Sequence, residues 1–456
     1  MSISISEIRH PFFLGIGGSG MSALAQYLQG IGKQVSGSDR LFASPSEVRE
    51  KLEAAGIRCY AQDGSGFSKD IDVVIVSTAV EDTVEEYRMA KERGIPVLHR
   101  SDLLALIAAS RKTIAVAGTS GKSTTSAMLY SILEHAGLEP GIISGAGLTK
   151  LIRKGLIGNA AVGGGEWLII EADESDGSII QYHPAIGVLL NIDKDHQELD
   201  ELVRLFKVFR EQSDVFIVNR SHSLSAGLST DQQLDFSADP SSEAGSVAMD
   251  FQQSGMEIRF RVGDVWFELN QVGRHNMENA LAAVAVARTL GVSLEVAAEA
   301  LRQYEGIYRR HQVLGNKNGV WVIDDFAHNP AKCAASIRAC QPIAPKLIAW
   351  FQPHGFKPTR FLRPDYVQEI SAALRPGDEI WMSEIYFAGG TAQRDISAND
   401  LVEDLRQLGV SAYFIEDRNH FMDAVRSHLN ADTVLLLMGA RDPSLEQFAQ
   451  QVWNAL

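Results

Sequence analysis

Long apolar runs are missing from this chain of 456 residues. A membrane-spanning helix needs about 18 or more consecutive apolar residues, and no stretch of the sequence approaches that length. We therefore predict no membrane span and no membrane partner. The first residues also lack a basic segment followed by an apolar run, so a secretory signal peptide is not expected there.

Cysteine and positive charge are scarce as well. Cys59, Cys333 and Cys340 show no metal-type spacing, and such an odd, sparse set favours reduced thiols in the cytoplasm. Lys and Arg number 42 against 57 Asp and Glu, which gives a formal net charge of -15. This balance disfavours non-specific binding to nucleic acid, because nucleic acid is itself negative. Small anions are not excluded, since a helix N-terminus or a single Lys can bind phosphate.

Short apolar segments alternate with amphipathic helices, which indicates an α/β fold with parallel sheets. At roughly 100–200 residues per domain, we expect about three domains. The predicted domains are residues 1–110, 111–315 and 316–456. The strands that define them are Phe12–Ile16, Gln34–Gly37, Val73–Ser77, Thr113–Ala117, Trp167–Glu171, Ile186–Asn191, Val320–Asp324, Lys346–Phe351, Glu379–Ser383 and Thr433–Met438.

A glycine-rich run between a predicted strand and a predicted helix is the strongest functional signal. Its residues are Gly118, Thr119, Ser120, Gly121, Lys122, Ser123 and Thr124. Glycines let backbone N–H groups approach an anion, and the positive end of the helix dipole favours phosphate. Lys122 can neutralise the outer phosphates of ATP, and the Ser123 hydroxyl can bind Mg²⁺. Val116 stands where the full phosphate-loop motif has its first glycine, and an ordinary turn is the alternative.

Acidic side chains follow the next two apolar strands of the same domain. The first group is Glu171-Ala172-Asp173-Glu174-Ser175-Asp176, and the second, Asn191-Ile192-Asp193-Lys194-Asp195-His196, ends in a histidine. Ligands bind at the carboxyl ends of parallel strands, and a carboxylate there can hold the Mg²⁺ that bridges ATP phosphates. We select Glu174 for the first Mg²⁺. His196 is a second contact or a structural residue, because Mg²⁺ prefers oxygen.

A second glycine loop, Gly15-Ile16-Gly17-Gly18-Ser19-Gly20, lies between the first strand and helix. Asp39 follows about 20 residues later at the end of the next strand, as in the dinucleotide-binding fingerprint. The same geometry suits any pyrophosphate. The loop therefore predicts either NAD or a UDP-sugar.

With these motifs and further stretches in the same order along the chain, the sequence resembles the Mur ligase family, especially its alanine-adding members. The matching stretches are GIGGSGM (15–21), SGSD (36–39), HRSDLL (99–104), AGTSGKSTT (117–125), EADESDGS (171–178), NIDKDH (191–196), GRHNMENALAA (273–283), RRHQVLG (309–315), DDFAHNP (324–330), FQPHGFKPTR (351–360) and MGARD (438–442). The resemblance implies a Rossmann-like UDP-binding domain, a central phosphate-loop ATPase domain and a C-terminal Rossmann-like lid. It also implies a cytoplasmic monomer or homodimer that uses ATP and Mg²⁺.

The implied reaction couples the carboxylate of UDP-N-acetylmuramate to an amino acid, with alanine as first choice, through an acyl phosphate. This step belongs to peptidoglycan precursor synthesis. By motif position, catalysis would involve Lys122, Glu174, His196, His328 and Arg310, and the metal would contact Ser123, Glu174 and His196. Asn276 and Asn279 would hold adenine, Asp324 or Asp325 the ribose, and Arg310 the γ-phosphate. Substrate binding would involve Gly17, Ser19, Gly20, Met21, Ser38, Asp39, Arg100, His354, Lys357 and Arg360.

The sequence departs from the alanine-adding pattern at a few positions. Ser120 replaces a histidine of the phosphate loop, and Asn329 replaces the second of two histidines. Gly355 and Pro358 stand where that pattern has arginines. A bidentate Arg holds a carboxylate well, and Lys357 could substitute only as a point charge.

These departures leave the amine open between an amino acid and a short peptide. A recycling ligase that adds a peptide, or another Mur-type amide ligase, therefore remains an alternative. Two other classes also remain. One is an NAD-dependent oxidoreductase, which would leave the phosphate loop unexplained. The other is a weakly catalytic protein that binds a nucleotide sugar.

Overall fold

The computed structural model describes residues 3–77, 80–81, 83–193, 198–387 and 393–456. The chain divides into two compact units. The first comprises residues 1–250, 260–269 and 275–308, and the second comprises residues 251–259, 270–274 and 309–456. No helix among the described residues is long and apolar enough to cross a membrane.

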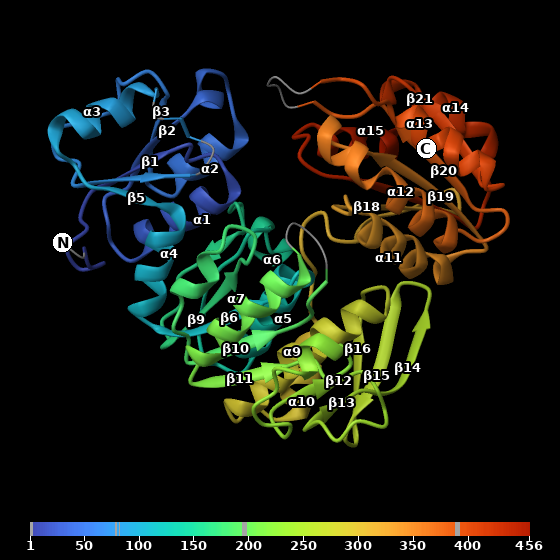
Figure 1. Ribbon diagram of the computed structural model, residues 1–456, viewed down its shortest axis with the longest axis horizontal. Helices are drawn as coiled ribbons and strands as arrows, with labels where there is room; N and C mark the ends of the chain where they lie inside the picture. The colour runs from blue at the N-terminus through green and yellow to red at the C-terminus, as the bar shows by residue number, and fades with distance from the viewer. Residues whose placement is uncertain (1–2, 78–79, 82, 194–197, 388–392) are drawn as a thin grey trace. The chain divides into compact units, whose positions relative to one another are not determined.

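The N-terminal part of the first unit is built on a parallel five-stranded sheet in the order β3-β2-β1-β4-β5 (Figure 1). The strand order reverses between β1 and β4, and ligands bind at such a point in doubly wound folds. The elements are β1 (Pro11–Leu14), α1 (Ser19–Gly30), β2 (Ser36–Asp39), η1 (Arg40–Ala43), α2 (Glu47–Ala54), β3 (Arg58–Ala61), β4 (Val73–Val76), α3 (Glu85–Arg93), β5 (Val97–His99) and α4 (Arg100–Ala109).

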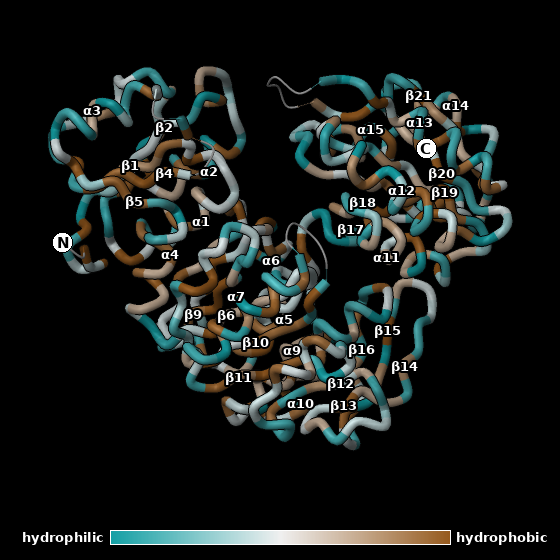
Figure 2. Tube along the Cα trace, in the orientation of Figure 1, coloured by the Kyte–Doolittle hydropathy of each residue, from teal (hydrophilic) through white to brown (hydrophobic). Residues whose placement is uncertain are grey.

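A second, six-stranded sheet in the order β11-β10-β6-β9-β7-β8 follows in the same unit. Its strands are parallel except for β8. The elements are β6 (Lys112–Ala117), α5 (Lys122–His135), β7 (Gly141–Ile143), α6 (Thr149–Ile152), β8 (Ala160–Ala161), β9 (Trp167–Ala172), η2 (Ser178–Gln181), β10 (Ile186–Leu189), α7 (Leu199–Glu211), β11 (Val215–Val218), α8 (Ser223–Ala226), α9 (Arg274–Thr289) and α10 (Leu294–Arg302). Figure 2 colours β6 and β10 largely as hydrophobic, in accord with the burial of β10 and of β6 after Lys112.

Two small sheets lie between β11 and α9 in the sequence. The first pairs β12 (Phe236–Ser237) with β13 (Ser246–Val247). The second has the order β14-β15-β16, with β14 at Met249–Ser254, β15 at Glu257–Val262 and β16 at Val265–Leu269. Residues 251–259 and 270–274 belong to the second compact unit. The domain predicted from the sequence at residues 111–315 includes both segments.

The second unit carries a six-stranded sheet in the order β17-β18-β22-β19-β20-β21, with only β17 antiparallel to its neighbour. Apolar side chains cover both faces of the sheet in two separate clusters. The elements are β17 (Gln312–Lys317), β18 (Val320–Asp325), α11 (Pro330–Cys340), η3 (Gln341–Ile343), β19 (Lys346–Gln352), α12 (Phe356–Ala373), β20 (Glu379–Ser383), α13 (Ala398–Gln407), β21 (Ser411–Ile415), η4 (Arg418–His420), α14 (Phe421–Val425), η5 (Arg426–His428), β22 (Thr433–Gly439) and α15 (Leu445–Ala455).

The predicted α/β class with Rossmann-like parallel sheets is confirmed. The predicted strands coincide with observed ones to within about two residues, because strands buried on both faces read as continuous apolar runs. The three large sheets present the carboxyl ends of their parallel strands to loops that carry predicted site residues.

Candidate active site

The glycine-rich loop between β6 and α5 has the backbone geometry that its sequence predicts. Gly121 lies just before α5 with a φ of 90°. A Cβ atom at this position would lie 2.4 Å from Oδ1 of Asn279 on α9, so only glycine fits. Asn279 is buried, and it accepts a hydrogen bond from Thr125 and donates one to Asn276. Of the two asparagines predicted to hold adenine, Asn279 therefore packs against the phosphate loop at Gly121, and Asn276 bonds to Asn279.

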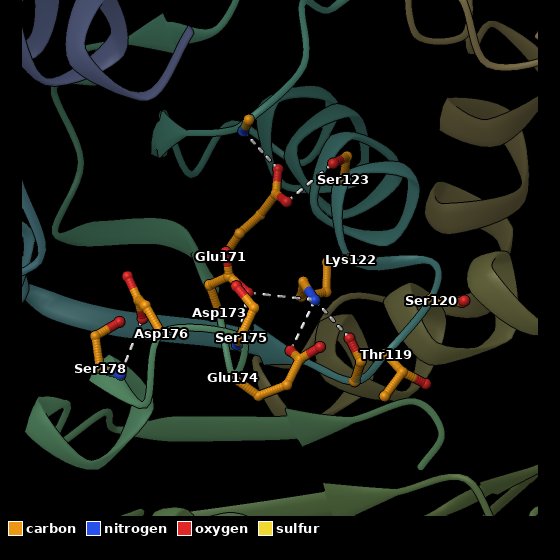
Figure 3. Close-up of polar contacts among 12 residues, drawn as sticks. Thr119, Ser120, Lys122, Ser123, Glu171, Asp173, Glu174, Ser175, Asp176 and Ser178 are labelled. Atoms are coloured by element: carbon orange, nitrogen blue, oxygen red, sulfur yellow. Dashed lines mark hydrogen bonds and ion pairs between the residues drawn. The ribbon is translucent and has the colours of Figure 1, made fainter. Parts of the chain in front are cut away.

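Lys122 points back over the loop and binds a carboxylate (Figure 3). Its Nζ donates to the carbonyl oxygen of Gly118 at 2.7 Å and to Oε2 of Glu174 at 2.8 Å. Oδ1 of Asp173 lies 4.0 Å away. Burial works to lower the pKa of Lys122, but Glu174 and Asp173 outweigh burial and raise this pKa above its ordinary value. The lysine is therefore held charged at the mouth of the loop.

The Ser123 hydroxyl donates to Oε2 of Glu171 at 2.9 Å. The other oxygen of Glu171 accepts from the Ser144 hydroxyl and from the Gly145 N–H, each at 2.7 Å. The sequence favours Glu174, and not Glu171, as the acid that shares the first Mg²⁺ with Ser123. In the structure Glu174 binds Lys122 instead, and Glu171 is the carboxylate at the serine. His196 lies outside the described residues.

The first glycine loop is braced by Asp39 at the end of β2. Oδ2 of Asp39 accepts from the Gly17 N–H at 3.0 Å, and Oδ1 accepts from the Leu41 N–H at 2.9 Å. The Ser38 carbonyl accepts from Gly15 at 2.8 Å. Both oxygens of Asp39 thus already bind backbone groups, whereas the dinucleotide fingerprint uses this acid for a ribose hydroxyl.

The helix that follows this loop is tied to the segment before β8. Asn159 donates to the Ser19 carbonyl at 2.7 Å and to the Ser22 hydroxyl at 3.0 Å. Met21, which was predicted to face the UDP-sugar, is instead buried in the apolar core. Its side chain therefore packs among apolar residues of that core.

A small cavity joins the two glycine loops. It has a volume of about 80 Å³. Its lining residues are Gly20, Leu24, Arg100, Ser101, Leu104, Lys122, Ile143, Ser144, Gly145, Glu171, Asp173 and Tyr182. The Arg100 guanidinium donates to Oδ2 of Asp176 at 3.3 Å. A larger cavity of about 490 Å³, lined in part by Glu134 and His135 at the other end of α5, contains none of the predicted site residues.

Arg309 and Arg310 begin the last segment of the second unit. Arg309 is buried and donates to both oxygens of Asp324, at 2.9 and 3.3 Å, and to the Gly439 carbonyl at 3.1 Å. Asp325 is also buried and accepts from the His311 N–H at 3.0 Å. Both predicted ribose acids are thus bound to neighbours within their own unit. The Arg310 guanidinium lies over the Phe326 ring, 5.1 Å from its centroid.

Two histidines of the second unit lie together at the ends of β18 and β19. The His328 and His354 ring centroids are 5.6 Å apart. Burial, aided by Lys332, lowers the pKa of His328 to about 4, and burial, aided by Arg441, lowers the pKa of His354 to about 4. Asn329 caps α11, because its Oδ1 accepts from the Lys332 N–H at 2.9 Å. Asn329 therefore has a structural role as the N-cap of α11.

The run after His354 is less suited to binding a carboxylate than the alanine-adding pattern. Gly355 precedes α12 with φ 74° and ψ 122°. Lys357 is exposed. Arg360 is ion-paired with Asp395 at 2.7 Å, with both side chains about 46% exposed. Pro358 is also exposed and lies in the first turn of α12, where the missing N–H of proline is tolerated.

Three family models match successive parts of the chain. They are described as "Mur ligase family, catalytic domain" for residues 11–112, "Mur ligase middle domain" for residues 116–287 and "Mur ligase, glutamate ligase domain" for residues 309–441. A UDP-N-acetylmuramate–L-alanine ligase from Pelotomaculum thermopropionicum is 34% identical over 455 residues and is covered to 95%, as is this chain. The chain belongs to the Mur ligase family.

Solved structures of Mur ligases share the architecture. The UDP-N-acetylmuramate–alanine ligase from Thermotoga maritima aligns with a TM-score of 0.80 at 25% identity, over 98% of each chain. A murein peptide ligase from Psychrobacter arcticus aligns with a TM-score of 0.68 at 21% identity, also over 98% of each chain. The second match shows a shared fold only.

As a Mur ligase, the chain is an ATP-dependent, ADP-forming enzyme that uses Mg²⁺. The oxygens at Ser123 and Glu171 fit that ion. The Ser123 hydroxyl and one Glu171 carboxylate oxygen lie 2.9 Å apart, so both would be within reach of one small cation. Both are hard donors of the kind that Mg²⁺ prefers.

Proposed function

We propose that this Mur ligase joins L-alanine to the carboxylate of UDP-N-acetylmuramate, in the synthesis of peptidoglycan precursors. The Pelotomaculum relative is named as a UDP-N-acetylmuramate–L-alanine ligase, and its similarity to this chain extends over nearly the whole of both. This similarity supports the same pair of substrates. The observation that carries the proposal is the cavity that Gly20 and Arg100 share with Lys122 and Glu171. This cavity, the proposed reaction space, contacts both the first glycine loop, which would bind a pyrophosphate, and the phosphate loop, which would bind ATP.

The chemistry follows from these groups. A carboxylate oxygen of the sugar substrate attacks the γ-phosphorus of ATP, which forms an acyl phosphate and releases ADP. The amine then attacks the acyl carbon, and phosphate leaves. No covalent bond to the protein is needed, so the protein contributes positioning and charge neutralisation. Mg²⁺ bound by Ser123 and Glu171 would neutralise phosphate charge.

We assign roles to residues around this reaction space. Lys122 neutralises the outer phosphates, and Arg100, held by Asp176, faces the sugar nucleotide at the Gly20 end of the cavity. The nucleotide roles of Asn276, Asn279, Arg310, Asp324 and Asp325 stay predictions, as do the substrate roles of Gly17, Ser19, Ser38 and Asp39 and the catalytic role of His328. The domain boundaries near residues 110 and 315 stay predictions as well.

We also propose that the enzyme works in the cytoplasm as a monomer or homodimer. Its three cysteines are free and buried, which suits a reducing compartment.

Phosphate release tests the main proposal. Purified protein is supplied with Mg²⁺, ATP and UDP-N-acetylmuramate, and the amine is varied between L-alanine, other amino acids and a tripeptide. We expect phosphate release that requires the sugar nucleotide and is fastest with alanine. Release that depends on the tripeptide alone would identify a peptide-adding ligase, which the missing arginines at Gly355 and Pro358 favour. Binding of NAD without turnover of ATP would overturn the proposal.

A further inference from the structure

We propose that Asn191 is a positioning residue that holds the phosphate loop in its nucleotide-binding shape. Asn191 follows β10, and β10 pairs with β6 in parallel, with Leu189 opposite Ala117. Because of this register, the segments that leave the two strands run side by side. The loop after β6 is therefore in contact with the loop after β10, and the position of one determines the position of the other.

The side-chain amide of Asn191 makes three hydrogen bonds to two consecutive loop residues. Its Oδ1 accepts from the Thr119 hydroxyl and from the Ser120 N–H, each at 2.9 Å, and its Nδ2 donates to the Ser120 carbonyl at 3.0 Å. The Asn191 carbonyl also accepts from the Thr119 N–H at 3.3 Å. This pattern requires both a donor and an acceptor on one short side chain. Aspartate lacks the donor, and leucine lacks both.

This arrangement divides the loop into two functional parts. The N–H groups of Thr119 and Ser120 are bonded to Asn191, so the first half of the loop acts as an anchor. The first N–H groups of a helix have no partner within the helix. Phosphate binding therefore falls to the start of α5, together with Lys122. If Asn191 were removed, the anchor would loosen, and the N–H groups at the helix start would lose their alignment.

Thr119 extends the anchor further along the chain. Its hydroxyl donates to Asn191 and accepts from the Asp193 N–H at 3.0 Å. A Cβ atom at Gly118 would come within 3.1 Å of the Asn191 backbone nitrogen, so the two backbones are in close contact. The loop and the segment from Asn191 to Asp193 thus form one hydrogen-bonded body. This inference rests on the proposed ATP site at the phosphate loop.

Substitution of Asn191 by alanine tests the proposal. Asn219 supplies a matched control, because it follows the neighbouring strand β11 and bonds to Ser221 and Glu278 rather than to the loop. Binding of a non-hydrolysable ATP analogue with Mg²⁺ is measured by calorimetry. We expect Asn191→Ala to weaken binding about tenfold or more, because its amide bonds to the loop are lost. Asn219→Ala should change binding by less than about twofold.

A double-mutant cycle separates positioning from general destabilisation. Thr119→Val removes the hydroxyl that donates to Asn191. On its own it should weaken binding of the analogue. Added to Asn191→Ala it should cost less than it does alone, because the bond to Asn191 is already gone and only the bond from the Asp193 N–H remains to be lost. Additive effects would overturn the proposal. So would an Asn191→Ala protein that binds the analogue as tightly as wild type, or that loses no more affinity than Asn219→Ala at an equal drop in Tm.

The controls also separate this inference from the proposed function. If the wild-type protein does not bind the ATP analogue, the proposed ATP site fails. If wild type binds it and Asn191→Ala binds it equally well, only the positioning role fails. KM for the sugar nucleotide gives a further check. The Asn191 side chain bonds to the phosphate loop, so this KM should stay within about twofold.

Discussion

Lys122 and Glu174 form a buried ion pair at the phosphate loop, with Nζ and Oε2 separated by 2.8 Å. The Lys122 side chain is 16% exposed and that of Glu174 is 6% exposed. Each charge depends on the other, because a buried charge without a partner is costly. Glu174 therefore stabilises the charged form of Lys122, the lysine that we propose for neutralising the outer phosphates, and it is not the carboxylate next to Ser123.

Replacement of Lys122 by alanine should abolish ATP turnover and also destabilise the fold. Loss of the lysine removes neutralisation of the transferring phosphate and takes the cation away from the buried Glu174 carboxylate, which costs about 3 kcal/mol of unfolding free energy at neutral pH. Burial raises the pKa of Glu174, so the deficit should shrink as pH falls and the carboxyl becomes neutral. Urea unfolding and phosphate release measure the two effects. Glu174→Gln added to the Lys122→Ala variant should restore stability but not turnover. If stability is not restored, loss of the ion pair does not explain why Lys122→Ala is less stable.

The choice between Glu171 and Glu174 as the magnesium ligand gives a second prediction. Glu171→Gln should raise the Mg²⁺ concentration for half-maximal activity by at least about tenfold, since it removes a charged oxygen beside Ser123. Ser123→Ala should shift the Mg²⁺ dependence in the same direction. Glu174→Gln should shift it less. Activity measured across a Mg²⁺ titration decides, and a larger shift for Glu174→Gln would restore the assignment made from the sequence.

The strands and the phosphate loop could be predicted because their patterns are local. Glu379–Ser383 is a short apolar run closed by polar residues, and it forms β20 with those bounds. Gly121 and Lys122 follow a buried strand directly, so the strand-to-helix turn could be recognised from spacing alone. In both cases neighbours in the sequence supply the information that sets the structure.

Side-chain partners could not be predicted, because they depend on which strands pair. Glu171 and Glu174 are three residues apart in one acidic stretch, and nothing local says that the first faces Ser123 and the second Lys122. In the sequence, Asn191 is notable only as the first residue of the stretch that ends in His196. Its importance follows from the register of β10 on β6, which brings it to the loop.

The two buried histidines of the second unit predict a loss of stability in acid. The pKa of His328 and that of His354 are both about 4, below the unfolded value of roughly 6.5. Unfolding therefore takes up protons between these values. The stability that the neutral rings contribute is complete above about pH 6.5 and is lost as pH falls toward 4.

Each ring should contribute up to about 1.4 kcal/mol per pH unit within this window. Urea unfolding at several pH values between 4.5 and 7 measures the slope for wild type, His328→Asn and His354→Asn. Each variant should lose part of the pH dependence. His420→Asn, at an exposed position, should keep the wild-type slope. Equal slopes in all four proteins would contradict the burial argument.

The run from His354 to Arg360 predicts weak binding of the alanine carboxylate, and it offers two ways to restore an arginine. Gly355 has φ 74° and ψ 122°, a conformation that favours glycine. Gly355→Arg should therefore cost about 1–3 kcal/mol of stability through backbone strain, and it should not improve KM for alanine. Pro358 is exposed and lies in the first turn of α12, where an arginine is free of this strain.

Pro358→Arg should lower KM for alanine by about tenfold or more, because a charge-assisted bond to a carboxylate is worth roughly 1.5–3 kcal/mol. Pro358→Gln is the matched control, since it removes the proline without adding charge, and it should leave KM close to wild type. Steady-state phosphate release at varied alanine concentration compares the three proteins. If the Arg and Gln variants have the same KM, the carboxylate is held elsewhere. If wild type already has a low-micromolar KM that does not respond to changes at Lys357 and Arg360, this run does not bind the amino acid at all.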